Sequence, residues 1–442
     1  MTDLWHQLPE ATRTALVARG VESWQQVYDG VATHNKEWRP LRPPIMSADT
    51  YRELTDISST VARLILAACL RRATTAGELR QALNMPVDAI DLLDDDLPLT
   101  DDLLGGVRAD ILLADGTPYV VEANIDSALG GAHDSDGVAR RFLAAYAGDP
   151  VLESLALTAP PSAVDARYKA VRTALTLTGT DRLAMVFTTG STYPGSQDGL
   201  AMIKLLEPFS QRGRELGLDM RVYPVEWLTL DAAGRLCVED GPIDAVLRMF
   251  VPQGTKPSDG LQALHTANRT GAVRMFTQTA SWLLASKAIL AWLWEDLADL
   301  SPEDAEVVRR HVPRTEVLSG DLRPRAVAEQ NQLVLKPSGS YGGVGVVVGP
   351  EVSRHTWAAA LDAAISERGY ILQSHVDVDR LTMQFVNVST GETQESAVPF
   401  CIAPYLFANT PAGAYLRFTV PGAGPVVNVG QGALTSGLLL VP

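Results

Sequence analysis

Residues 106–126, GVRADILLADGTPYVVEANID, carry the pattern around which the rest of the chain is organised. Two apolar runs flank an Asp-Gly dipeptide that is typical of a tight β-hairpin turn. Polar side chains interrupt each run at a spacing of two, so the two in each strand point to one face. These residues are Arg108 and Asp110 in the first strand and Glu122 and Asn124 in the second.

The register of this hairpin decides whether the four polar residues share a face. A three-residue loop at 115–117 would place Asp110 opposite Glu122 and bring all four together. A two-residue Asp-Gly loop would instead place Asp110 opposite Val121 and separate the two pairs. We predict the longer loop and the shared face. Two carboxylates and an amide oxygen beside an arginine are a donor set that Mg²⁺ uses together with phosphates.

A second pattern lies at residues 332–349, QLVLKPSGSYGGVGVVVG, where a strand, a glycine-rich run and another strand, from Val344, follow one another. Backbone N–H groups of such a loop can cradle phosphate oxygens. It is not a Walker loop, and it is not a Rossmann fingerprint because a strand follows it. We therefore predict a lid over nucleotide phosphates, and a plain hairpin is the alternative. The predicted contacts are Lys336, Ser338, Gly339, Ser340, Gly342 and Gly343.

Composition indicates an ordinary globular chain of two or three domains, with 442 residues of which 46% are hydrophobic and 20% charged. The net charge of −15 argues against nucleic acid or an anionic membrane as a partner. We find neither a signal peptide nor an apolar run of about 18 residues, so we expect a cytoplasmic protein with no membrane partner. Three widely spaced cysteines indicate reduced thiols, not a metal site.

Periodicity divides the chain into units. Residues 1–104 show helical spacing, whereas residues 163–275 have the β-α-β rhythm of an open α/β sheet. Ligands bind such sheets at the carboxyl ends of strands, which makes Thr189 and Ser191 candidate pocket residues. Arg248, within an apolar strand, is either a structural ion pair or an anion ligand. The predicted units are 1–104, 105–162, 163–275 and 276–442.

The loop after the hairpin, SALGGAHDSD at 127–136, has two interpretations. Glycine and short polar residues suit a loop that passes close to a ligand, where Asp126, His133, Asp134 or Asp136 would meet a substrate amine. A turn followed by a helix cap is the alternative. Arg417, a polar residue in an apolar strand, is a candidate for a substrate carboxylate, as is Arg248.

With these motifs placed, the chain resembles a circularly permuted ATP-grasp ligase of the glutathionylspermidine synthase type. Glu122-x-Asn124 resembles the family's Mg²⁺-binding strand, but it precedes the glycine loop, as in a permuted chain. SKAILAWLWED, from residue 286, resembles the helix that carries an ATP-phosphate lysine, here Lys287. ILQSHVD, from residue 371, resembles the adenine linker, which implies adenine contacts from Gln373, Ser374 and Val376.

The resemblance implies a mixed α+β and α/β fold, with a permuted ATP-grasp core, an open α/β domain and a helical N-terminal region. The implied cofactors are ATP and Mg²⁺, with the metal on Asp110, Glu122 and Asn124. A small-molecule carboxylate would become an acylphosphate, and an amine would convert it to an amide. Arg108 would stabilise the transferring phosphoryl group and then the oxyanion that forms when the amine attacks. Amino acids or small peptides are the default substrates, and a homodimer remains open. The alternative is a catalytically silent nucleotide-binding regulatory or scaffold protein.

Overall fold

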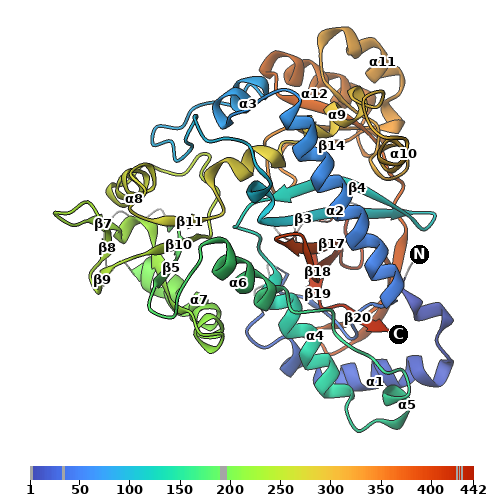
Figure 1. The fold of residues 1–442 in the computed structure, drawn as a ribbon. Coiled ribbons are helices and arrows are strands. Elements are labelled where there is room, and N and C mark those ends of the chain that lie inside the picture. Colours follow the sequence, from blue (N-terminus) through green and yellow to red (C-terminus); the bar gives the residue numbers. More distant parts are fainter. Residues whose placement is uncertain (1–2, 32–34, 190–196, 425–426, 428, 430–431) are drawn as a thin grey trace.

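A seven-stranded antiparallel sheet contains the hairpin predicted from residues 106–126 (Figure 1). The computed structural model describes residues 3–31, 35–189, 197–424, 427, 429 and 432–442. The strand order is β1-β16-β17-β18-β19, and β3 joins β17 while β4 pairs with β3. The strands are β1 (Trp38–Pro40), β3 (Gly106–Ala114), β4 (Thr117–Ile125), β16 (Arg380–Asn387), β17 (Thr393–Phe407), β18 (Thr410–Phe418) and β19 (Leu434–Ser436).

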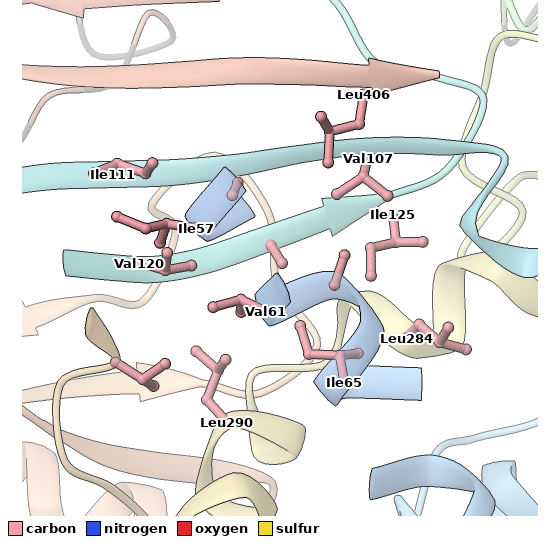
Figure 2. Close-up of a cluster of buried hydrophobic side chains, with 14 of the residues drawn as sticks. Ile57, Val61, Ile65, Val107, Ile111, Val120, Ile125, Leu284, Leu290 and Leu406 are labelled. Atoms are coloured by element: carbon pink, nitrogen blue, oxygen red, sulfur yellow. The ribbon is translucent and has the colours of Figure 1, made fainter. Parts of the chain in front are cut away.

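Helix α2 (Ala48–Leu70) crosses the apolar face of this sheet (Figure 1). The helix begins where the Ser47 side chain accepts a hydrogen bond from the backbone N–H of Thr50. Its buried residues recur at intervals of three and four, which gives one apolar side. One face of the hairpin is therefore buried, and the polar residues are left on the other. Figure 2 shows Ile57, Val61 and Ile65 of α2 beside Val107, Ile111, Val120 and Ile125 of the hairpin and Leu406 of β17.

The second sheet is parallel and has the order β11-β10-β5-β6, which confirms the β-α-β rhythm of this part of the chain. A small antiparallel sheet, β7-β8-β9, lies beside it (Figure 1). The elements are α6 (Ala163–Ala174), β5 (Arg182–Phe187), α7 (Gln197–Glu215), β6 (Asp219–Pro224), β7 (Thr229–Leu230), β8 (Leu236–Val238), β9 (Gly241–Pro242), β10 (Ala245–Arg248), α8 (Asp259–Arg269) and β11 (Arg274–Phe276).

A third sheet, β12-β15-β13-β14, is antiparallel and carries the glycine-rich loop. The strand expected from Val344 begins only at Val347, because residues 342–345 form turns in which three glycines have positive φ. The fully buried Trp357 of α12 packs beneath this sheet. The elements are α9 (Ala288–Glu295), α10 (Pro302–His311), β12 (Thr315–Val317), α11 (Arg323–Ala328), β13 (Leu333–Pro337), β14 (Val347–Val348), α12 (Arg354–Glu367) and β15 (Tyr370–Ser374).

The first 104 residues form the expected helices and also two short strands that periodicity did not predict. Strand β1 pairs with β16, and β2 pairs in parallel with β20. These residues therefore join sheets formed with the C-terminal part of the chain. Among the described residues, no helix is long and apolar enough to cross a membrane. The remaining elements are α1 (Glu10–Val27), β2 (Ile45–Ser47), α3 (Ala76–Ala82), α4 (Ala132–Tyr146), α5 (Pro150–Glu153) and β20 (Leu439–Val441).

Candidate active site

The register of the β3–β4 hairpin places its four polar residues on one face, as predicted. Asp110 lies opposite Glu122, and Arg108 lies opposite Asn124. The predicted three-residue loop was wrong. The loop has two residues, because Ala114 pairs directly with Thr117.

A β-bulge in β4 places Asp110 opposite Glu122 in spite of the shorter loop. The pairing shifts between Asp110 and Ile111, where Val120 follows Glu122 as the next partner and Val121 is left over. Val121 and Glu122 consequently both line the cavity described below, while Val120 is fully buried in the core. Asp115 and Gly116 have the positive φ angles of a primed hairpin turn, which Asp-Gly favours.

A cavity of about 500 Å³ separates the polar face of the hairpin from the glycine-rich loop. Ligand-binding pockets commonly have this volume. The cavity therefore joins the two motifs that the sequence singled out, although they lie more than 200 residues apart. Of the predicted site residues, it is lined by Arg108, Asp110, Glu122, Asn124, Asp126, Lys336, Gly342, Gly343, Gln373, Ser374, Val376 and Arg417.

Asp110 is held by two arginines at the base of the cavity. Its Oδ2 lies 2.6 Å from Arg417 Nη2, and its Oδ1 lies 3.6 Å from Arg108 Nε. Burial by itself would raise the pKa of Asp110, but the two guanidinium groups outweigh it and hold the pKa below its usual range. The structure thus gives Arg417, predicted as a ligand for a substrate carboxylate, a carboxylate partner within the protein.

Two lysines approach the same region from different sides. Lys336 Nζ donates a hydrogen bond to Gln373 Oε1 at 2.6 Å. Burial lowers the pKa of Lys336 to about 8, with the Glu122 carboxylate opposing this effect and the Lys287 ammonium adding to it. Lys336 is half-buried, and among the described residues its ammonium donates to an amide and not to a carboxylate, which fits the predicted phosphate-binding role.

Lys287 lies behind the cavity wall and connects the glycine-rich loop to the hairpin. Its Nζ donates to the carbonyl oxygen of Ser340 at 2.7 Å and lies 3.4 Å from Glu122 Oε2. Its backbone N–H donates to the carbonyl of Ser338 at 2.9 Å. Helix α9 starts one residue later, at Ala288, and Lys287 is its N-cap. Neither Lys287 nor the predicted contacts Ser338, Gly339 and Ser340 line the cavity.

The structure brings the predicted substrate residues together only in part. Arg248 is fully buried and lies 2.9 Å from Asp126 Oδ2, so of the two interpretations the structure favours the ion pair. The carboxylate of Asp136 accepts hydrogen bonds from Ser162 Oγ at 2.7 Å and from backbone N–H groups at the start of α6. Asp136 therefore caps that helix and does not face the cavity. The backbone N–H of Thr189, away from the cavity, donates to Glu226, and Ser191 lies outside the described residues.

Tyr415, which the sequence analysis missed, packs between the two arginines of the cavity. Its ring centre lies 5.1 Å from Arg108 Cζ and 5.2 Å from Arg417 Cζ. Gly131 (φ +88°) approaches the same ring so closely that a Cβ there would come within 2.3 Å of it. The one signal for Tyr415 in the sequence is its position two residues before Arg417, on the same face of β18.

The donor types at the hairpin fit a magnesium ion that is shared with phosphate oxygens. Such ions use one or two carboxylates, and Asp110, Glu122 and Asn124 supply two carboxylates and an amide oxygen on one face. Among the described residues, no three His, Cys, Asp or Glu side chains form a metal-binding group. Asp110 and Glu122 are already ion-paired to cations of the protein. These residues therefore suit a metal ion that binds together with an anionic ligand such as a phosphate, because the ligand offsets the added positive charge.

No protein-family model matches this sequence, and no curated protein is similar to it in sequence. Among solved structures, the chain is similar to a glutathione synthetase-like effector from Globodera pallida, with 12% identity, a TM-score of 0.60 and 97% of each chain covered. It is also similar to a protein of Methylobacillus flagellatus assigned as a gamma-glutamylcysteine synthetase, with 13% identity, a TM-score of 0.46 and 89% of each chain covered. The first similarity shows a shared fold over nearly the whole chain. The chain thus has a mixed α/β fold that it shares over nearly its whole length with that effector.

Proposed function

We propose that this chain is an ATP-dependent ligase that joins a carboxylate to an amine and releases ADP and phosphate. One observation carries the proposal: a single cavity places the acidic and arginine-bearing face of the hairpin opposite a glycine-rich loop and the ammonium of Lys336. The fold similarity to a glutathione synthetase-like effector supports an enzyme of this class.

The nucleotide would bind between the two motifs. Lys336 and the backbone N–H groups of the glycine-rich loop would hold the phosphates, and Gln373, Ser374 and Val376 would line the adenine position. Lys287 would support this arrangement from behind, because it already joins the loop to Glu122. A magnesium ion on Asp110, Glu122 and Asn124 would offset the charge on the phosphates.

The proposed reaction has two steps. A carboxylate oxygen of the substrate attacks the γ-phosphorus, the bond to the β,γ-bridging oxygen breaks, and ADP leaves an acylphosphate behind. The amine nitrogen then attacks the acyl carbon, loses a proton and displaces inorganic phosphate. Arg108 is placed to bind the transferred phosphoryl group and then the oxyanion of the second step.

The chain order favours a permuted ATP-grasp core. Glu122 precedes the glycine-loop lysine, Lys336, by 214 residues (336 − 122), and both line one cavity. In this proposal residues 105–162 and 276–442 form the core, residues 163–275 form the substrate domain, and residues 1–104 support both.

Nucleotide binding is expected to weaken as the pH rises above 8. Lys336, with its pKa of about 8, is mostly charged at pH 7, and bound phosphate favours the charged form. Between pH 7 and 9.5 the loss of the proton should raise the Kd for Mg·ATP by on the order of tenfold, measured by calorimetry. Lys336→Met should bind weakly and show little of this pH dependence. Lys169→Met, at an exposed lysine of α6, should behave as wild type.

ADP release tests the proposal directly. With a panel of acids and amines, release should rise at least about tenfold over ATP alone when a correct pair is present, and mass spectrometry should identify an amide. A catalytically silent nucleotide-binding protein would be stabilised against heat by Mg·ATP without any acid-stimulated release. That outcome would replace the ligase assignment with the regulatory or scaffold alternative.

A further inference from the structure

We infer that the acid used by this chain carries no ammonium group: it is an aliphatic carboxylate, not a free amino acid. This inference rests on the proposed ligase function and names the substrate class of its cavity. Three features of the cavity support it: the pairing of its carboxylates, its charge balance and the apolar side chains among its lining residues.

Every carboxylate that lines the cavity within the described residues is already ion-paired. Asp110 is bound by Arg417 at 2.6 Å, and Asp126 is bound by the fully buried Arg248 at 2.9 Å. Asp126 also accepts a hydrogen bond from the backbone N–H of Ala128 at 2.7 Å. The third carboxylate, Glu122, lies 3.4 Å from Lys287 Nζ. A substrate ammonium would find no free carboxylate there.

The charge balance of the cavity disfavours a further cation. Two arginines and a lysine line it, and Lys287 and Arg248 contact its carboxylates from behind. These five cations face three carboxylates, which leaves an excess of two positive charges (5 − 3). Mg·ATP, with a net charge of about −2, would balance this excess but supply no free carboxylate.

Several of the residues that line the cavity have short apolar side chains. Leu129 is buried, and Ala128, Val251 and Ala285 are half-buried. Such a surface accepts an aliphatic chain, whereas an ammonium group would lose its hydration without a compensating partner. Arg108 also lines the cavity, and its Nη1 donates to the carbonyl of Gly130 at 3.0 Å. It can orient the substrate carboxylate.

Matched acids test the inference. We would measure ADP release at pH 7.5 with Mg·ATP, using hydroxylamine as a small acceptor that requires no carboxylate partner. The pairs are leucine and 4-methylpentanoate, valine and 3-methylbutanoate, and alanine and propanoate, which differ only in the α-ammonium group. We expect kcat/KM for the plain acid to exceed that for its amino acid by at least about tenfold in the best pair. The hydroxamate should form as inorganic phosphate leaves.

A designed carboxylate should reverse this preference. Val251→Asp would add a carboxylate to the lining of the cavity, and the ratio of kcat/KM for leucine to that for 4-methylpentanoate should rise at least about tenfold. Val251→Asn has nearly the same shape without the charge and should leave the ratio close to that of wild type. If Val251→Asp does not fold, the wild-type comparison still decides the question.

The outcomes separate the two claims. Equal or better use of the amino acids would overturn this inference while leaving the ligase function in place, since ADP would still be released. No release with either series would count against both. A rise in the ratio for both Val251 variants would mean that shape, not charge, sets the preference.

Discussion

Replacing Arg108 with alanine is expected to abolish substrate-dependent ADP release and to leave the fold intact. The Arg108 guanidinium lies between Asp110, the ring of Tyr415 and the carbonyl of Gly130, on the cavity face of the hairpin. Removing one preorganised group that stabilises transition-state charge commonly costs about 10²–10³-fold in kcat. Arg108 would act in both steps, so we expect at least the upper end of this range, measured as steady-state ADP release with a productive acid and amine.

Two further variants define what Arg108 contributes. Arg108→Lys keeps the charge but loses the planar fork that can bind two oxygens at once, so we expect only partial recovery of activity. Arg52→Ala removes an exposed arginine of α2 and should have wild-type turnover and stability. Circular dichroism should show the same fold for Arg108→Ala, because Asp110 keeps Arg417 as its partner. Wild-type turnover in Arg108→Ala would refute the site assignment.

Replacing Arg417 with methionine should lower the free energy of unfolding by about 3–5 kcal/mol at pH 7. Arg417 is 6% exposed and is the nearest cation to the buried carboxylate of Asp110. Without it, Asp110 must either remain charged with only the more distant Arg108 or bind a proton. Urea unfolding at pH 7 measures this loss, and Arg52→Met is the matched surface control.

The pH dependence of this variant follows from the lowered pKa of Asp110. In the wild type, the ion pair stabilises the fold above the unfolded pKa of about 3.9, and this contribution is lost as pH falls through the lower folded pKa. The difference between wild type and Arg417→Met should therefore be large at pH 7 and smaller at pH 3, below the unfolded pKa. Adding Asp110→Asn to Arg417→Met should recover much of the lost stability at pH 7. A deficit that is the same at both pH values would show that packing, not charge, is responsible.

Short-range patterns in the sequence identified the two motifs of the site. Alternation with period two placed the polar residues of the hairpin on one face, and the glycine-rich run between two apolar strands identified the loop beside Lys336. The α/β rhythm of residues 163–275 likewise appears as a parallel sheet. These predictions depend on backbone preferences and side-chain alternation within a few residues, which the local sequence contains.

The partners of the site residues were decided only by the tertiary structure. The bulge at Val121 is invisible in a pattern that a three-residue loop would explain equally well, because both give the same register. Asp110 and Arg417 are paired although they lie 307 residues apart in the chain (417 − 110), and Lys287 contacts the loop at Ser340, 53 residues further along the chain. The sequence by itself determined which residues face outward from each strand. The tertiary structure decided which charged partner each of these residues has. It therefore also decided whether any carboxylate is left for a substrate, because these contacts depend on long-range packing that no local pattern encodes.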